Sequence, residues 1–325
     1  MYPFTRTRRI RNGPRLRRMF QEQDPQPRQL VLPIFCDANL DRARPVGSMP
    51  GVMAYPFEDL AALAEEAESL GLGALLLFGI PDSKDAEGSS GWAEDGVAQK
   101  ALRLLKSASD IPLIADLCLC EYTDHGHCGV WDGKSVDNDA TLELYGLCAQ
   151  SLAAAGADVI APSGMMDGQV MAIRSALDDD GWSELPVMAY SAKFASPLYG
   201  PFREAACSAP QAGDRLCYQI PPGNGREGMR EMLLDEEEGA DALIVKPALP
   251  YLDLLAEQRR RSDIPLAAYQ VSGEYAMARA AADAGWLDLH AVMDENFKAI
   301  LRAGADIIIS YYAMDYARRG QETIP

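Results

Sequence analysis

Eight short apolar runs separated by helical patterns are the feature of this sequence that most limits its fold. Their hydrophobic residues are continuous rather than alternating, which is typical of strands that helices cover on both faces. The runs span residues 30–35, 73–78, 111–120, 157–162, 185–190, 242–245, 264–269 and 305–309. Eight strands alternating with helices favour an α/β fold of the (β/α)8 TIM-barrel type. An open doubly wound sheet is the alternative, although no GxGxxG motif follows the first run.

A short turn sequence recurs between the helical and apolar segments. Gly-Ala-Asp occurs at 156–158, 239–241 and 304–306, and Gly-Leu-Gly-Ala at 71–74 is a looser copy. The first glycine of each copy is placed to end a helix in a left-handed conformation. Asp-Ile-Pro-Leu at 110–113 recurs at 263–266, and proline is tolerated at a strand entrance. The repeats indicate one helix-to-strand unit used several times.

Charge divides the chain into a basic arm and an acidic body. Residues 1–18 contain seven arginines and no acid, whereas the rest of the chain contains 23 basic and 48 acidic side chains. We expect residues 1–28 to form an N-terminal arm and 29–325 the barrel. The arm could be a transit peptide, a solvated tail, or a segment that lies on the acidic surface of a neighbouring subunit, and we expect the last. The net charge of −18 argues against nucleic-acid binding.

The length of the apolar stretches and the number of cysteines indicate a cytoplasmic globular protein. The longest apolar stretch, near 74–80, is far shorter than a membrane span, and the N-terminus does not resemble a secretory signal. Seven cysteines, an odd number, do not suggest a disulfide framework, so metal or thiol chemistry becomes the better explanation.

Three cysteines form a candidate metal site after the third predicted strand. Cys118 and Cys120 are expected on one face of an extended strand, and glycines at 126 and 129 allow the chain to bring back Cys128. Three thiolates suit zinc and leave a fourth position for water or substrate, as in catalytic sites. Buried apolar cysteines are the alternative. His127 and Cys217 are additional candidates near the metal.

Two lysines lie at the ends of the fifth and sixth predicted strands. Lys193 and Lys246 both follow buried runs, and Pro247 follows Lys246 directly. Burial and a neighbouring cation both lower the pKa of a lysine and produce the neutral amine that attacks a carbonyl group. Either lysine alone could be a surface residue whose stem packs on apolar neighbours. Their placement on adjacent strands favours carbonyl chemistry.

Other polar residues at strand ends are candidates for substrate binding. The interval 195–236 after the fifth strand is expected to form a lid over the active site. Arginine forks suit carboxylates, neutral hydroxyls can bind a second carboxylate, and an acid can hold an amine. The candidates for these three roles are, in turn, Arg203, Arg215 and Gln219; Ser272 and Tyr311; and Asp116. Ser163 ends the fourth predicted strand and is a further polar candidate. Ordinary ion pairing is the alternative for the charged members.

Long motifs along almost the whole chain resemble the porphobilinogen synthase family, also called 5-aminolevulinate dehydratase. The segments are DLCLCEYTDHGHC (116–128), VDNDATLE (136–143), APSGMMDG (161–168), YSAKFAS (190–196), YGPFREAA (199–206), VKPALPY (245–251) and YQVSGEYA (269–276). One departure is Asp124, where the family usually has serine; we expect its side chain to face solvent.

The resemblance implies a (β/α)8 lyase that condenses two molecules of 5-aminolevulinate to porphobilinogen in tetrapyrrole (heme) biosynthesis. It implies that Lys246 forms a Schiff base with the propionate-side substrate and that Lys193 engages the acetate-side one. It implies a catalytic zinc on the three cysteines, which places the chain in the zinc-dependent branch. It further implies a homo-octamer with embracing arms and, in some members, an allosteric magnesium at the position of Glu231.

Two other function classes fit part of the pattern. A class I aldolase-type enzyme would use Lys246 but would not need three thiolates. A non-catalytic zinc-binding regulator would use the cysteines but would not need two buried lysines.

Removal of the arm tests the expected assembly. Deleting residues 1–18 is expected to yield smaller particles in analytical ultracentrifugation, because seven arginines without internal acids repel one another unless an acidic surface receives them. An unchanged octamer, or a full-length chain that is monomeric at micromolar concentration, would contradict this expectation.

Overall fold

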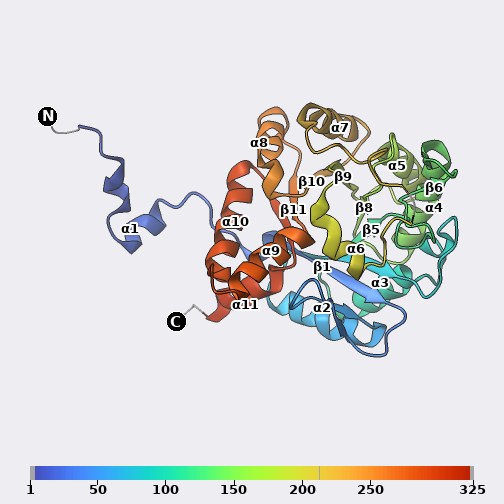
Figure 1. Cartoon of the computed structure of the whole chain (residues 1–325), viewed down its shortest axis with the longest axis horizontal. Coiled ribbons are helices and arrows are strands. Elements are labelled where there is room, and N and C mark those ends of the chain that lie inside the picture. Colours follow the sequence, from blue (N-terminus) through green and yellow to red (C-terminus); the bar gives the residue numbers. More distant parts are fainter. Residues whose placement is uncertain (1–3, 212, 323–325) are drawn as a thin grey trace.

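Eight parallel strands close into a barrel in the computed structural model, which describes residues 4–211 and 213–322 (Figure 1). Each strand pairs with the next in chain order, β12 pairs with β1, and a parallel bridge between Ile160 and Val187 joins β8 to β9. The barrel strands are β1 (Leu30–Asp37), β4 (Ala74–Ile80), β5 (Leu113–Leu117), β8 (Val159–Pro162), β9 (Met188–Lys193), β10 (Ala242–Lys246), β11 (Leu266–Gln270) and β12 (Ile307–Ser310). The predicted (β/α)8 fold is confirmed.

Helices surround this barrel and cover the outer faces of its strands (Figure 1). They are α2 (Leu60–Ser69), α3 (Val97–Ala108), α4 (Asn138–Ala154), α5 (Gln169–Asp179), α7 (Gly225–Glu237), α8 (Leu252–Arg261), α9 (Ser272–Asp283), α10 (Leu289–Ala303) and α11 (Ala313–Glu322). The short α6 (Gly200–Ala205) instead lies at the carboxyl end of the barrel and packs against α9. In α3, for example, Ala98, Ala101, Leu102 and Leu105 form one buried face, as the helical period requires. None of the helices within 4–211 and 213–322 has the length and apolarity needed to cross a membrane.

Short strands and 3-10 turns lie in the segments that connect the barrel strands and the helices. The short strands are β2 (Arg44–Pro45), β3 (Met53–Tyr55), β6 (Val130–Trp131) and β7 (Val136–Asp137). The 3-10 turns are η1 (Thr7–Arg11), η2 (Pro27–Gln29), η3 (Phe57–Asp59), η4 (Ser89–Gly91), η5 (Pro197–Tyr199) and η6 (Leu249–Tyr251). The expected lid at 195–236 contains η5, α6, an irregular stretch and most of α7, which packs against β9.

The Gly-Ala-Asp repeat fastens neighbouring strands together at their amino ends. The three glycines have φ values of 102°, 99° and 113°, so each ends its helix in the left-handed region. Each aspartate then bonds one residue at the start of the preceding barrel strand twice: its backbone N–H donates to that residue's carbonyl, and its carboxylate accepts that residue's N–H. The pairs are Asp158 with Leu113, Asp241 with Val187, and Asp306 with Leu266.

The looser copy of the repeat at 71–74 contacts the preceding strand through its backbone alone, without a carboxylate. Gly71 also has a positive φ, of 74°, but Gly73 takes the place of the aspartate. The Gly73 N–H donates to the Leu30 carbonyl at 2.9 Å, and a Cβ there would clash with the Arg28 carbonyl. Close backbone approach therefore replaces the carboxylate bond at this one strand start.

The third strand is shorter than the sequence predicts. Strand β5 ends at Leu117, and the Leu119 carbonyl accepts N–H bonds from Tyr122 and Thr123, so the chain is already turning there. The expectation that Cys118 and Cys120 lie on one face of an extended strand is therefore wrong. The apolar run continues past the strand because Leu119 and the cysteines are buried in a turn, which hydrophobicity alone does not distinguish from a strand.

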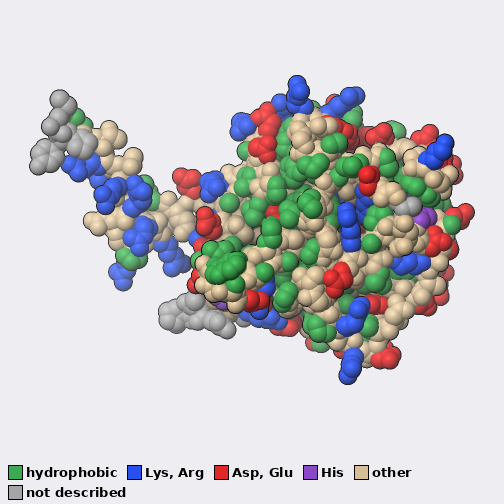
Figure 2. Space-filling model, in the orientation of Figure 1, with side chains coloured by type: hydrophobic (Ala, Val, Ile, Leu, Met, Phe, Trp, Pro, Cys, Tyr) green, Lys and Arg blue, Asp and Glu red, His purple; other side chains and the backbone are tan. Residues whose placement is uncertain are grey.

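The N-terminal arm extends away from the barrel (Figure 1). Its described part includes η1 and α1 (Pro14–Met19), and neither element has a buried residue. Figure 2 shows Lys and Arg side chains along the arm and many Asp and Glu side chains on the visible face of the body. The arm thus presents its positive charge to the surroundings rather than to its own barrel.

Loss of one repeat carboxylate is expected to lower stability without changing the carboxyl end of the barrel. Asp241→Ala removes the acceptor of the Val187 N–H, which lies 2.8 Å from the carboxylate, and a bond of this kind contributes about 1 kcal/mol. Asp241→Asn keeps an oxygen acceptor and serves as the matched control. We expect Asp241→Ala to have a lower midpoint than Asp241→Asn in thermal unfolding; equal midpoints would contradict this role.

Candidate active site

The two predicted lysines lie side by side at the carboxyl end of the barrel. Lys193 ends β9 and Lys246 ends β10, and the pairing of these strands puts the two residues in register. Each is only 5% exposed. Two buried amines at adjacent strand ends are the arrangement that the sequence predicts.

Aromatic rings enclose the amine of Lys246. Its Nζ lies 4.2 Å from the ring centroid of Tyr269, 5.0 Å from Tyr190, 5.1 Å from Phe202 and 5.4 Å from Tyr199. Burial, reinforced by the positive charge of Lys193, lowers the pKa of Lys246 to about 7. Near neutral pH a large part of this lysine is therefore a neutral amine that can attack a carbonyl carbon.

Lys193 is tied to a polar chain that runs to β5. Its Nζ donates to the Ser163 carbonyl, and the Ser163 hydroxyl donates to Asp116 Oδ2 at 3.1 Å. The other carboxylate oxygen of Asp116 is buried and has no hydrogen-bond partner. Burial, with a smaller contribution from Glu121, raises the pKa of Asp116 to about 7. An unpartnered buried oxygen next to two lysines is suited to receive a polar group of a substrate.

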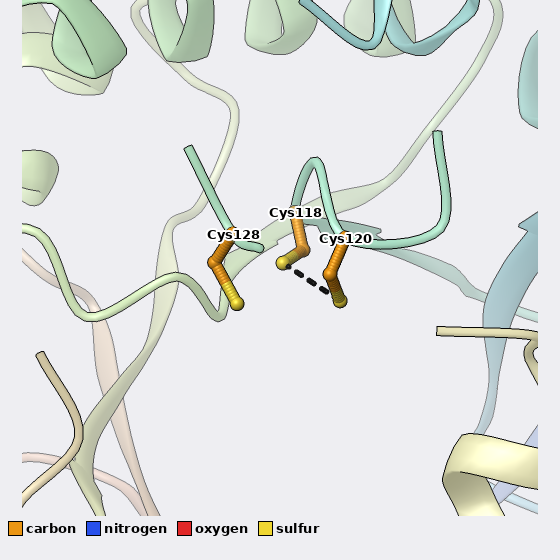
Figure 3. A group of neighbouring side chains, drawn as sticks. All are labelled: Cys118, Cys120 and Cys128. Carbon is orange, nitrogen blue, oxygen red and sulfur yellow. Dashed lines mark hydrogen bonds between the residues drawn. The ribbon is translucent and has the colours of Figure 1, made fainter. Parts of the chain in front are cut away.

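The three predicted cysteines meet at the same end of the barrel, as Figure 3 shows. All are buried, their sulfur atoms lie within 4.8 Å of one another, and the Sγ atoms of Cys118 and Cys120 are 3.3 Å apart. Cys118 and Cys120 follow β5, while Cys128 returns from the loop before β6. The loop through residue 126, rather than strand alternation, brings the third sulfur to the other two.

These donors fit a metal cation. Burial raises the pKa of the Cys118 thiol well above its usual value, whereas hydrogen bonds from the Cys118 and Cys120 thiols hold the pKa of Cys128 well below. A cation among the sulfurs would stabilise all three as thiolates despite their burial. Three protein donors also leave a coordination position open.

The side chains that are predicted to bind a substrate carboxylate have polar atoms that are buried and lack a hydrogen-bond partner. Gln219 is 2% exposed, and neither polar atom of its side chain has a hydrogen-bond partner. The Nε atoms of Arg203 and Arg215 are also buried and unpartnered. Arg215 is anchored through Nη2 to the carbonyls of Ser208 and Gly126, at 2.6 and 3.0 Å. Free N–H groups of this kind suit an anionic ligand.

Ser272 and Tyr311, the pair predicted to bind a second carboxylate, contact other groups of the protein itself. The Ser272 hydroxyl donates to the Leu198 carbonyl at 3.1 Å and accepts the Phe202 N–H at 3.0 Å. The Tyr311 hydroxyl lies 3.2 Å from that of Tyr269, one of the rings around Lys246. Ser272 therefore holds η5 and α6 in place, and Tyr311 borders the lysine pocket.

The remaining candidates lie outside the three-cysteine cluster. Glu231 lines a cavity of about 540 Å³ with Asp167 and Glu227, and burial with these two acids raises its pKa. His127 is buried and stacks on Trp131 with 4.1 Å between ring centroids. Cys217 and Asp124 are exposed, the latter as expected.

Sequence reasoning missed Glu274, which holds the chain that follows Lys246. This carboxylate is 4% exposed and accepts N–H bonds from Leu249 and Val271, both at 2.7 Å, and from Ala248 at 3.4 Å. A glutamate at the third position of a helix is a common capping signal and could have identified it. The aromatic enclosure was also missed, because its rings come from β9, from the lid elements η5 and α6, and from the distant β11.

These features define the class of the protein: an enzyme of the (β/α)8 barrel type with its chemistry at the carboxyl ends of the strands. Within that class, the chain belongs to the delta-aminolevulinic acid dehydratase family, whose model matches residues 4–319. The family predicted from the motifs is confirmed, and with it an enzyme of the lyase class.

Similar proteins cover almost the whole chain. The delta-aminolevulinic acid dehydratase of Escherichia coli is 51% identical over 315 residues, 97% of each chain. That of Synechococcus elongatus is 48% identical over 323 residues, 98% of this chain and 99% of the relative. The solved structure of delta-aminolevulinic acid dehydratase (porphobilinogen synthase) from Toxoplasma gondii, in complex with the reaction product porphobilinogen, has a TM-score of 0.95 at 40% identity and covers 99% of this chain and 94% of that one.

The environment of Lys246 predicts a pH profile for its reactivity. Because its pKa is lowered to about 7, reductive methylation with formaldehyde and cyanoborohydride should rise through a midpoint near pH 7 when followed at this residue by peptide mapping. Lys193→Met removes the neighbouring cation, so the midpoint should move to higher pH. A midpoint near pH 10 in the parent protein would contradict the assignment.

Proposed function

We propose that this protein condenses two molecules of 5-aminolevulinate to porphobilinogen with release of two water molecules. The observation that carries the proposal is the buried amine of Lys246, with its lowered pKa, next to Lys193 at the barrel mouth. The family match and the porphobilinogen bound to the Toxoplasma gondii relative support this choice of substrate and product.

Lys246 starts the reaction on the propionate-side substrate. Its lone pair attacks the ketone carbon, the carbonyl oxygen takes up protons and leaves as water, and a Schiff base remains. The four rings exclude water from this carbon–nitrogen bond. Asp116 and Ser163 hold the amino group of this substrate, and Ser272 and Tyr311 bind its carboxylate.

The acetate-side substrate binds on the opposite side of the pocket. Arg203, Arg215 and Gln219 bind its carboxylate, which agrees with the buried, unpartnered atoms of these three side chains. Lys193 engages its carbonyl carbon. One C–C and one C–N bond then form between the two substrates and close the ring. The bonds from substrate carbon to the lysine nitrogens break, so that the lysines return as free amines, and carbon-bound protons are lost as the pyrrole becomes aromatic. The oxygen of the other carbonyl leaves as the second water.

Cys118, Cys120 and Cys128 would hold the catalytic metal, and we propose zinc, since three thiolates suit this ion. Zinc held there supplies Lewis-acid polarisation to the acetate-side substrate. We further propose Glu231 as a ligand of an allosteric magnesium, because Asp167 and Glu227 add negative charge around the same cavity.

The two other function classes explain less of this site. A class I aldolase-type enzyme would account for Lys246 but not for the cluster of three buried thiols. A non-catalytic zinc regulator would account for the thiols but not for two buried lysines or the arginines beside them.

We propose a homo-octamer in which the arm lies on a neighbouring subunit. The arm has no buried residue in η1 or α1, and the acidic body offers a complementary surface. Trp286 is 80% exposed and lies next to the half-exposed Leu287, an apolar pair suited to a subunit contact. We place the protein in the cytoplasm, where reducing conditions keep its seven free cysteines as thiols.

Borohydride reduction with labelled 5-aminolevulinate tests the function and the lysine roles together. We expect the label on Lys246 in the parent enzyme and also in Lys193→Ala, because the amine of Lys246 is the activated nucleophile. Lys193→Ala should nevertheless make almost no porphobilinogen. In Lys246→Ala the label should largely disappear.

Two results would contradict these roles. One is peptide mapping that finds the label mainly on Lys193 in the parent enzyme. The other is porphobilinogen formation that persists in Lys246→Ala. Absence of any label and of any product in the parent enzyme would overturn the proposed function itself.

A further inference from the structure

A buried tyrosine on α4 holds the backbone of the third cysteine. The ring of Tyr145 is fully buried, and its hydroxyl donates to the Cys128 carbonyl at 2.6 Å. The contact joins residues 17 positions apart in the sequence. Cys128 belongs to the metal loop, defined here as residues 118–130.

The same face of α4 holds the end of the metal loop. Thr141 lies one helical turn before Tyr145, and its hydroxyl accepts the Val130 N–H at 2.9 Å. Between the two contacts lies Gly129, where a Cβ would clash with the Thr141 side chain. Residues 128–130 therefore rest directly on the helix.

Gly164 leaves the space that the tyrosine needs. A Cβ at this position would overlap the Tyr145 hydroxyl and would also clash with the ring carbon that carries it. Gly164 follows Ser163, which contacts both Lys193 and Asp116. The tyrosine thus reaches the Cys128 carbonyl by passing over the chain at the carboxyl end of β8.

Cys128 needs such support more than the other two cysteines do. Cys118 directly follows the barrel strand β5, so the barrel itself fixes its position. Cys128 lies ten residues further on, at the end of a loop that contains Gly126, and ordering a loop of this kind costs conformational entropy. A contact that fixes its backbone beforehand reduces the entropy lost when the metal binds.

We infer that Tyr145 is a positioning residue for the metal site, which keeps the Cys128 sulfur within reach of Cys118 and Cys120. The inference rests on the proposed metal role of these cysteines. Groups that orient metal ligands typically contribute about 10-fold or more to metal affinity. The hydroxyl of Tyr145 acts through the backbone and need not touch substrate.

Tyr145→Phe removes this hydroxyl and keeps the ring. We expect its zinc Kd, measured by competition with a chromophoric chelator on the full-length protein, to rise about 10-fold. The matched control is Tyr312→Phe, which removes another fully buried hydroxyl that donates to a backbone carbonyl, that of Tyr275 at 3.0 Å. This control should keep the parent zinc affinity.

Cobalt substitution adds a spectroscopic measurement. Sulfur-to-cobalt charge-transfer absorption reports the thiolates bound to the ion, and Cys128→Ala supplies the spectrum of a site with one thiolate removed. We expect the spectrum of Tyr145→Phe to move from that of the parent towards that of Cys128→Ala, and that of Tyr312→Phe to match the parent.

Gly164→Ala tests the same contact from the other side. The added methyl group displaces the hydroxyl, so the zinc Kd should rise although Tyr145 is present. In Tyr145→Leu the side chain no longer reaches over residue 164. Adding Gly164→Ala to that variant should therefore cause little further loss, a non-additive result that indicates a shared cause.

The outcomes separate this inference from the proposed metal site. A parent protein that binds neither zinc nor cobalt through the cysteines overturns the metal site, and the role of Tyr145 with it. A parent that binds zinc while Tyr145→Phe keeps the same Kd and cobalt spectrum overturns the role of Tyr145 alone. An equal loss of affinity in Tyr312→Phe would also overturn it, because the effect would then be a general loss of stability.

Discussion

The pairing of β9 with β10 places two lysine amines together at the carboxyl end of a hydrophobic barrel, and the rest of the site depends on this constraint. Lowering the pKa of Lys246 from 10.5 to about 7 corresponds to roughly 5 kcal/mol against its charged form. The aromatic rings around Lys246 maintain this effect by excluding water. Asp116 opposes it, since its negative charge favours the ammonium form. The balance between the two leaves an amine that can change protonation state near neutral pH.

The metal half of the site is built on a different principle. Strand pairing fixes the lysines, but only one end of the metal loop is attached to a barrel strand. The loop is ordered by contacts from outside: α4 holds residues 128–130, and the loop before α3 pairs its Asp85 with Tyr122 and Asp124 through the backbone. The barrel and its loops therefore position the two halves separately. Ser163 joins Lys193 to Asp116 on β5, the strand that the metal loop follows.

The fold could be predicted from the sequence because barrel strands are continuous apolar runs and several helices end at a recognisable glycine. The sequence located the lysines and cysteines, since polar residues interrupt or end apolar runs there. It failed at the end of β5, because a buried turn and a strand have the same hydrophobicity. The sequence also did not indicate a role for Tyr145. In the sequence this tyrosine is indistinguishable from an ordinary core residue, and only the tertiary structure shows its hydroxyl against the Cys128 carbonyl.

The segment that carries Arg215 and Gln219, the proposed carboxylate-binding residues, packs directly against the metal loop. Arg215 donates to the Gly126 carbonyl, and the Gln211 N–H donates to that of His125, so the segment before Gln219 rests on the metal loop. A Cβ at Gly126 would clash with the Ala209 carbonyl, which shows how closely the two segments approach. Ordering either segment reduces the conformational entropy that the other has left to lose. Order in one segment therefore supports order in the other, although the two lie on separate stretches of the chain.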